Sequence, residues 1–294
     1  MQAMILAAGF GTRLLPYTEF CPKPLFTLLN RPLLLLTIER LQRAGFDHII
    51  VNCHHLRRQV IDLLQNIKGV VIQEEDMILG TGGGLRLAMK SFRNEPVLVT
   101  NGDIYHMVDF RSLYEAHQND SASVTLAMHD FQRFNKVSVQ DNRVTGFDIP
   151  GNQGLLAFTG LHVLNPEILS TIPLLKSSSI IDLYRRLLEE KKCIRALRVD
   201  GCYWTDMGTV NDYLALHGGL LAGDIPWWQE LGVQPESPFF LAEGVRRADT
   251  VVMKDWVCAG RVEIGEDVHL ERVVLWNGVS VPGRSRLKDT LIVK

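Results

Sequence analysis

An α/β fold with a mixed, mostly parallel sheet flanked by helices is the fold class that the sequence predicts. Short apolar runs alternate with helical patterns through the first half of the chain, and glycine or proline bounds several of them. Strands separated by helices indicate βαβ units and a parallel sheet covered on both faces. After about residue 120 the alternation loosens, which favours a mixed sheet in that part.

The elements follow in order along the chain. Ala3–Ala8 is a short apolar run that stops at Gly9, which is typical of a buried strand. A helix is predicted over Leu33–Ala44, because Pro32 suits its first turn and Gly45 its C-terminal cap. Further predicted strands are His48–Cys53, Val70–Gln73, Pro96–Thr100, Ser123–Met128, Lys136–Val139, Val144–Ile149 and Leu155–Leu164. Further predicted helices are Leu56–Gln65, Gly84–Phe92, Ile180–Lys191 and Thr209–Leu221, the last with Thr209 as its N-cap.

The C-terminal part of the chain has a different pattern. Residues 223–250 are proline-containing and irregular, and they are predicted to be a linker packed on a main domain of residues 1–222. In residues 251–294, apolar residues recur every six positions from Val262 onward. This period predicts a short left-handed β-helix of the hexapeptide type, while a few ordinary hairpin strands are the alternative.

Composition and charge exclude several classes of function. The net charge of −2 gives no reason to expect nucleic acid or an anionic membrane as a partner. The longest largely apolar run, Pro32–Ile38, is too short to span a bilayer, and the N-terminus lacks the pattern of a signal peptide. Five cysteines without a CxxC pair indicate neither a zinc site nor a disulfide framework, so a cytoplasmic location fits best.

A glycine-rich loop follows the first predicted strand. Its sequence is LAAGFGTRLLP, beginning at Leu6, and a Pro-Lys-Pro segment follows at Pro22–Pro24. Backbone amides in such a loop can face phosphate oxygens, because glycine has no Cβ to block their approach. Arg13 and Lys23 add positive charge. A dinucleotide fingerprint is excluded, since Leu14 replaces its third glycine, and no Walker sequence occurs.

These two motifs closely resemble the signature of the sugar-1-phosphate nucleotidylyltransferases, and the resemblance runs from residue 2 to about residue 222. It implies a Rossmann-like nucleotide-diphospho-sugar transferase fold and an enzyme that joins an NTP to a sugar 1-phosphate with release of pyrophosphate. The catalytic residues implied are Arg13 and Lys23. The loop residues implied in nucleotide binding are Ala8, Gly9, Gly11 and Thr12.

Two aspartates are candidates for a Mg²⁺ site. Asp103 follows the predicted strand Pro96–Thr100, at the edge where parallel sheets bind ligands, and Mg²⁺ prefers a carboxylate together with substrate phosphates. The segment WTDMGT around Asp206 resembles the W-x-D-x-G-T motif of the family, which implies Asp206 as the second ligand. The expected cofactor is therefore Mg²⁺. A glycosyltransferase is disfavoured, because Tyr105 stands where an Asp-x-Asp motif needs an aspartate.

The resemblance also implies where the nucleobase binds. Three successive glycines, Gly82–Gly84, open a predicted helix, and in the family this loop packs on the base. The expected base-side residues are Gln73, Gly80, Thr81 and Gly82, with Glu75 as an alternative to Gln73. The loop does not distinguish GTP from UTP.

The acceptor side departs from the family pattern. The expected sugar-phosphate-binding residues are Lys136, Phe158, Thr159 and Gly160. Many members carry a Glu-Lys pair after a Gly-Phe, but here Asp148 and Ile149 follow it. Another cation must then meet the acceptor phosphate, and Lys136 and Arg133 are the candidates.

Several functions remain open at this point. The leading options are GTP with mannose 1-phosphate or a heptose 1-phosphate, and UTP with N-acetylmuramate 1-phosphate or another hexose 1-phosphate. We favour guanylyl transfer, because a β-helical tail is common among guanylyltransferases. A regulatory subunit that binds nucleotide sugar without turnover is an alternative of another class. The tail is also a candidate surface for a homo-oligomer.

Overall fold

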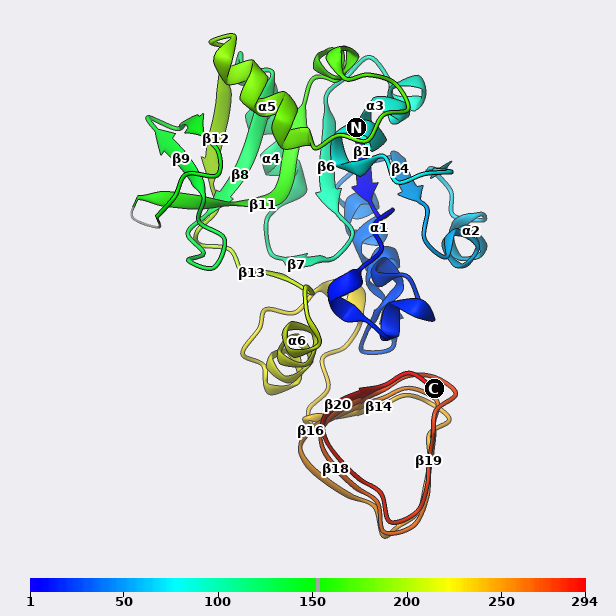
Figure 1. The fold of residues 1–294 in the computed structure, drawn as a ribbon. Helices are drawn as coiled ribbons and strands as arrows, with labels where there is room; N and C mark the ends of the chain where they lie inside the picture. Colours follow the sequence, from blue (N-terminus) through cyan, green and yellow to red (C-terminus); the bar gives the residue numbers. More distant parts are fainter. Residues whose placement is uncertain (152–153) are drawn as a thin grey trace. The chain divides into compact units, whose positions relative to one another are not determined.

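A computed structural model describes residues 1–151 and 154–294 of the chain (Figure 1). The residues cluster into two compact units. Unit 1 consists of Met1–Phe10, Ile38–Gly102 and Val108–Trp204, and unit 2 of Gly11–Thr37, Asp103–Met107 and Thr205–Lys294. The sequence-based boundaries at residues 222 and 250 stay a prediction.

A mixed sheet of nine strands forms the centre of unit 1. Its strands are β1 (Gln2–Leu6), β4 (His48–Cys53), β5 (Val70–Glu74), β6 (Val97–Asn101), β8 (Val124–His129), β9 (Val137–Gln140), β10 (Arg143–Gly146), β11 (Leu155–Leu164) and β12 (Ile194–Arg198). They run in the order β5-β4-β1-β6-β11-β8-β12-β10-β9. The first four are parallel, and β11 is antiparallel to both of its main neighbours, β6 and β8. The predicted mixed α/β fold is confirmed.

Helices cover both faces of this sheet (Figure 1). The helices that belong wholly or in part to unit 1 are α1 (Leu33–Arg43), α2 (Arg57–Leu64), α3 (Gly80–Ala88), α4 (Phe110–Gln118) and α5 (Ile180–Glu189). Helix α6 (Val210–Ala222) lies in unit 2. Leu85 of α3 and Leu183 of α5 share one apolar cluster with Leu126 of β8. The neighbouring Thr125 points to the opposite face, where its hydroxyl lies 3.0 Å from His117 Nδ1 of α4. No helix in the described part of the chain has the length and hydrophobicity that a membrane crossing requires.

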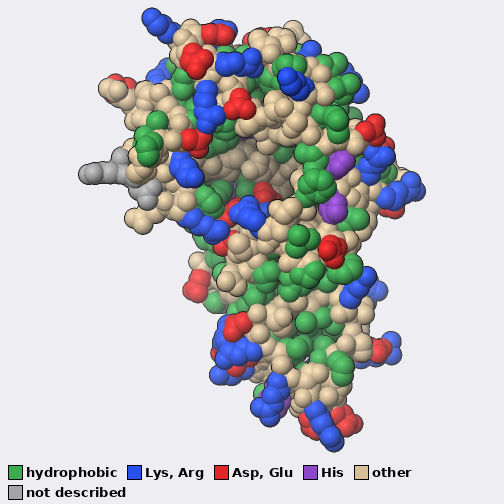
Figure 2. Space-filling view, in the orientation of Figure 1, with side chains coloured by type: hydrophobic (Ala, Val, Ile, Leu, Met, Phe, Trp, Pro, Cys, Tyr) green, Lys and Arg blue, Asp and Glu red, His purple; other side chains and the backbone are tan. Residues whose placement is uncertain are grey.

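The C-terminal tail in unit 2 is built from short parallel strands. The strands outside the large sheet are β2 (Thr27–Leu28), β3 (Arg31–Pro32), β7 (Ile104–His106), β13 (Trp204–Asp206), β14 (Phe239–Leu241), β15 (Arg246–Arg247), β16 (Val252–Ala259), β17 (Glu263–Ile264), β18 (His269–Leu275), β19 (Ser280–Val281) and β20 (Arg286–Ile292). In the tail, β14-β16-β18-β20 and β15-β17-β19 form two sheets. Val252 pairs with His269, and His269 with Arg286, so successive coils are 17 residues apart. Figure 1 shows these coils stacked, and Figure 2 shows acidic and basic side chains side by side on their outer surface.

Two predicted strands end earlier than the sequence pattern suggests. β1 stops two residues before Ala8, because the Ala7 N–H donates to Asn52 Oδ1 at 2.7 Å instead of continuing the ladder. β10 stops three residues before Ile149, where Asp148 takes a positive φ of 53°. Helix α4 and strands β7, β12 and β13 were not among the predicted elements.

Helix α3 begins four residues before the predicted start at Gly84. Glycine disfavours a helix interior, so the sequence places Gly82 and Gly83 ahead of the predicted helix. In the structure, Ser178 O accepts a hydrogen bond from the Gly82 N–H at 2.9 Å, and Thr81 Oγ1 accepts one from the Ile180 N–H at 2.9 Å. These tertiary contacts stabilise a first turn that helix propensity alone would not.

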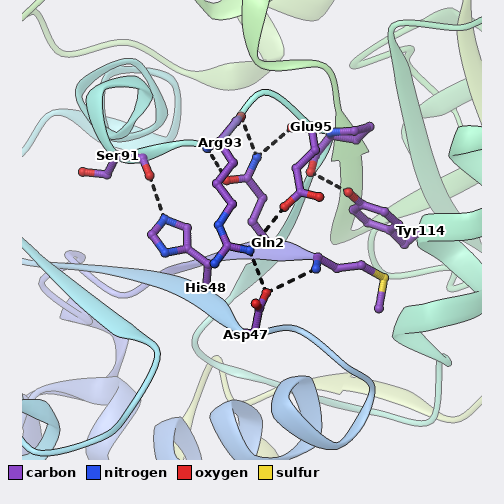
Figure 3. Close-up of polar contacts among 9 residues, drawn as sticks. Gln2, Asp47, His48, Ser91, Arg93, Glu95 and Tyr114 are labelled. Atoms are coloured by element: carbon purple, nitrogen blue, oxygen red, sulfur yellow. Dashed lines mark hydrogen bonds and ion pairs between the residues drawn. The ribbon is translucent and has the colours of Figure 1, made fainter.

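A polar network joins the amino ends of β1, β4 and β6 (Figure 3). Gln2 donates to the carbonyl oxygens of Arg93 and Glu95 at 3.0 and 2.7 Å, and it accepts from the Arg93 N–H at 2.8 Å. Asp47 pairs with Arg93 at 2.8 Å and with the N-terminal amine of Met1 at 3.3 Å. The hydrogen bond from Arg93 lowers the pKa of Asp47 to about 2. We refer to these five residues as the amino-edge network.

Candidate functional site

Four charged side chains lie together in unit 2. Lys23 Nζ forms an ion pair with Asp103 Oδ2, and Arg13 Nη2 lies 3.7 Å from Asp206 Oδ2. The two cations are the residues predicted to be catalytic, and the two carboxylates are those predicted to bind metal. We refer to these four residues as the charged cluster.

Gly11 allows the loop that carries Arg13 to fold back on itself. It adopts a left-handed φ of 65°, and a Cβ at this position would lie 2.8 Å from Thr18 Cγ2. The short helical turn Thr12–Leu14 follows, with Leu14 fully buried as its anchor. The Arg13 side chain remains 56% exposed, so it is accessible to a bound polyanion.

Lys23 is held more firmly than Arg13. It is only 8% exposed and begins the turn Lys23–Leu25, in which its carbonyl accepts from the Phe26 N–H at 3.0 Å. The buried Phe26 ring packs edge to face against Trp276 of the tail, with centroids 4.9 Å apart. Tyr213 of α6 receives a hydrogen bond from the Trp276 indole at 3.0 Å and also contacts the Phe26 ring. The tail and α6 therefore support the segment that presents Lys23.

The two aspartates are brought together by a pair of short strands. β7 begins directly after Asp103, β13 ends at Asp206, and the two strands pair. The Met207 N–H donates to the Asp103 carbonyl at 2.9 Å. Gly208 permits the approach of the arginine, because a Cβ there would lie 2.5 Å from Asp206 Oδ2 and 2.6 Å from Arg13 Nη1.

The charged cluster has the donor set that a divalent cation needs. Burial raises the pKa of Asp206, and the negative charge of Asp103 raises it further, while Lys23 and Arg13 oppose the rise. Two mutually repelling carboxylates gain from a shared cation. No group of three or more metal-binding side chains occurs among residues 1–151 and 154–294. Substrate phosphates and water would therefore complete the coordination of a hard ion such as Mg²⁺.

Gln73 lies in unit 1 beside a buried carboxylate, Glu75, which is 1% exposed. Glu75 accepts hydrogen bonds from Asn52 Nδ2 at 2.8 Å, from Gln73 Nε2 at 3.3 Å and from the Leu79 N–H at 3.3 Å. Gln73 Nε2 also donates to the Gly84 carbonyl at 3.0 Å. Its Oε1 is buried without a protein partner in the described part of the chain. Sequence reasoning missed Asn52, because no motif marks it.

The expected base-side glycines pack against the protein's own backbone. A Cβ on Gly80 would lie 2.6 Å from Ser178 O, and one on Gly82 would lie 3.0 Å from Ser179 O. Internal packing is thus sufficient to require glycine at both positions. Gly9 differs, because its exposed backbone has nothing within 4 Å of an added Cβ. Gly9 is therefore accessible for ligand contact from its backbone, while the preceding Ala8 is buried.

The expected sugar-side residues on β11 are held by internal contacts. Gly160 has a φ of 79°, and a Cβ there would lie 2.5 Å from Asn101 Nδ2. Thr159 is buried: its hydroxyl donates to the Ala127 carbonyl at 2.8 Å, and its carbonyl accepts from Trp204 Nε1 at 2.9 Å. Of the three, the half-buried Phe158 has the side chain most accessible to a sugar.

An unexpected cation lies where the family's Glu-Lys pair is missing. Arg185 of α5 forms an ion pair with Asp148 and another with Asp182 at 2.9 Å. Lys136 is exposed, and the Arg133 guanidinium lies 5.0 Å from the centre of the Phe134 ring. Sequence reasoning missed Arg185, because the contact with Asp148 spans 37 residues.

The chain is similar to known proteins over most of its length. A family model described as nucleotidyl transferase matches residues 2–222. A mannose-1-phosphate guanylyltransferase of Mycobacterium tuberculosis is 28% identical over 96% of this chain and 81% of its own length. Mannose-1-phosphate guanyltransferase 2 of Candida glabrata is 30% identical over 73% of this chain, which spans 63% of that relative. The structure of HddC from Yersinia pseudotuberculosis complexed with GMP-PN is 25% identical, with a TM-score of 0.62, over 73% of this chain and 96% of that one.

Proposed function

Because this chain belongs to the nucleotidyl transferase family, as its motifs predicted, we propose that it uses Mg²⁺ to transfer a nucleotidyl group from an NTP to a sugar 1-phosphate. The observation that carries this proposal is the charged cluster, in which Lys23 meets Asp103 and Arg13 lies near Asp206. Each carboxylate has a cation beside it, and each cation has a role on a phosphate once a substrate binds.

The reaction is an in-line displacement at the α-phosphorus of the NTP. An oxygen of the sugar 1-phosphate forms the new P–O bond, and the bond to the departing pyrophosphate breaks. The attacking oxygen is already anionic, so no general base is needed. Catalysis then consists of positioning and charge stabilisation.

The residues of the charged cluster divide this work. Mg²⁺ held by Asp103 and Asp206 would offset the repulsion between the two polyanions. Lys23 and Arg13 exchange their carboxylate partners for phosphate oxygens, where they stabilise charge on the α-phosphate and on pyrophosphate. The backbone of Ala8, Gly9, Gly11 and Thr12 contributes N–H donors to the same phosphates.

Guanylyl transfer to mannose 1-phosphate or a heptose 1-phosphate is the reaction we favour. The relatives named as mannose-1-phosphate guanylyltransferases support it, as does the similarity to a protein complexed with GMP-PN. Uridylyl transfer to N-acetylmuramate 1-phosphate is the alternative, because this chain also lacks the Glu-Lys pair. In either case Gln73 and the segment Gly80–Gly82 would face the base, and Phe158–Gly160 with Lys136 the sugar phosphate.

A pyrophosphate-release screen tests the proposal. The full chain is incubated with Mg²⁺, each of four NTPs, and mannose, heptose, glucose or N-acetylmuramate 1-phosphate. Release with GTP and mannose or heptose 1-phosphate is expected. Release only with UTP supports the alternative, and nucleotide-sugar binding without release from any pair contradicts the catalytic role.

We also propose that the coiled tail is a left-handed β-helix that joins copies of the chain. The parallel pairing every 17 residues supports a helical coil, and Asp255, Arg272 and Asp289 take a positive φ at this same spacing. Light scattering of the full chain gives its mass in solution. A multiple of 33.2 kDa is expected, and the mass of a single chain contradicts assembly.

A further inference from the structure

A linker tryptophan packs directly on the strand that follows Asp103. The Trp228 ring stacks on Tyr105 of β7, with centroids 4.2 Å apart and an angle of 15° between the planes. It meets His106 of the same strand edge to face, with centroids 6.1 Å apart. Trp228 is only 2% exposed, although the segment around it is largely irregular.

Hydrogen bonds fix the same contact. Trp228 Nε1 donates to the His106 carbonyl at 2.8 Å, and the Trp228 N–H donates to Tyr105 Oη at 3.0 Å. The Tyr105 hydroxyl in turn donates to the Pro226 carbonyl at 2.7 Å. The linker therefore holds both the main chain and a side chain of β7.

The strand needs this support. β7 has three residues and, among residues 1–151 and 154–294, pairs only with β13, which also has three. A two-stranded ribbon is marginal on its own, and its position depends on what packs against it. Tyr105 lies two residues after Asp103, so a shift of β7 moves the Asp103 carboxylate directly. A displacement of about 1 Å in a catalytic group can cost roughly 10²-fold in rate.

We propose that Trp228 is a positioning residue that holds Asp103 at the location where the metal binds. Trp228 acts through β7, on which its ring stacks. The proposal rests on the proposed function and extends the site into the linker of residues 223–250.

The test compares two adjacent tryptophans. Trp228→Phe keeps an aromatic ring but removes the N–H that donates to His106. Trp227→Phe is the matched control, because the Trp227 indole donates to the Gly232 carbonyl at 2.8 Å within the linker itself. We expect Trp228→Phe to lower kcat and to raise the half-saturating Mg²⁺ concentration by about tenfold, with little change in KM for the NTP. Trp227→Phe should behave as the unaltered chain.

Binding of Mn²⁺, followed by electron paramagnetic resonance, gives a readout without turnover. The Trp228→Phe variant should bind Mn²⁺ about tenfold more weakly than Trp227→Phe, with equal circular dichroism. Equal Mn²⁺ affinity in the two variants overturns the positioning role, whatever the activity. If the unaltered chain releases no pyrophosphate with any substrate pair, the proposed function fails, while the Mn²⁺ comparison still decides the inference.

Discussion

Two charge networks in this molecule each pair aspartate with arginine, but the pKa of the aspartate shifts in opposite directions in the two networks. In the amino-edge network, Asp47 pairs with two cations, Arg93 and the amine of Met1, and its pKa falls to about 2. In the charged cluster, burial and the neighbouring Asp103 raise the pKa of Asp206. The Asp47 carboxylate already has two cationic partners within the protein. The Asp206 carboxylate would be stabilised further by the binding of another cation.

The residues around the two networks also differ: those of the amino-edge network form hydrogen bonds within the protein, while those of the charged cluster leave room around it. The side-chain amide of Gln2 forms hydrogen bonds with backbone groups of Arg93 and Glu95, and these bonds connect β1 to the segment before β6. In the charged cluster, Gly208 leaves out a Cβ that would prevent the approach of Arg13 to Asp206. The comparison indicates that Asp47 has its cationic partners within the protein, while the charged cluster keeps charges that a ligand can rearrange.

The largest expected effect comes from the metal-binding carboxylates. Asp103→Ala and Asp206→Ala should each reduce kcat by at least roughly 10²–10³-fold, because each removes charge stabilisation that acts in the transition state. Asp47→Ala should leave kcat unchanged. Steady-state pyrophosphate release measures all three, and a near-normal rate in Asp206→Ala would place the metal elsewhere.

Lys23→Ala should cost about 10²-fold in kcat, since the buried ammonium is held in place before the substrate binds. Arg93→Ala removes a cation of the amino-edge network and serves as the control. It should lower thermal stability and leave kcat intact. If Arg93→Ala lowered kcat as much as Lys23→Ala, the amino-edge network would not be purely structural, and the distinction between the two networks would be wrong.

Gln2→Ala should destabilise the fold by about 1 kcal/mol without changing the kinetics, because it leaves partly buried backbone groups of Arg93 and Glu95 without their side-chain partner. Urea unfolding followed by circular dichroism measures the free energy, and kcat is recorded on the same preparation. An unaltered free energy of unfolding would show that water replaces the Gln2 amide, and that Gln2 does not stabilise the amino-edge network.

The smallest effect expected is the difference between the two aspartates in pH dependence. The raised pKa of Asp206 means that protons compete with the metal, so Mg²⁺ affinity rises with pH until that pKa is passed. The pKa of Asp47 shifts in the opposite direction: it is lowered from 3.8 to about 2, so the contribution of Asp47 to stability is present above pH 3.8 and lost as pH falls through 2. Carboxyl ¹³C NMR titration measures both groups, and a pKa for Asp206 at or below that of Asp47 would contradict this account.

Much of the fold could be predicted from local sequence, and the limits have physical causes. β4 and β11 match their predicted bounds, because long runs of β-forming residues carry their own signal. The start of α3 could not be predicted, since it depends on Ser178, far away in sequence. β7 and β13 are too short for any period and form only because the chain brings them together.

The residues of the candidate site also fall into those that could be predicted from the sequence and those that could not. Arg13, Lys23, Asp103 and Asp206 lie in motifs and could be named from the sequence. Asn52, Arg185 and Trp228 could not, because each acts through a contact between distant segments and no spacing marks it.

The most direct test of the central claim is calorimetric titration of Mg²⁺, with a nonhydrolysable GTP analogue present, into the unaltered chain, Asp206→Asn and Asp47→Asn. The account predicts that the unaltered chain and Asp47→Asn bind Mg²⁺ equally, and that Asp206→Asn loses most of its affinity. Equal binding by Asp206→Asn and the unaltered chain would show that the charged cluster is only another structural network.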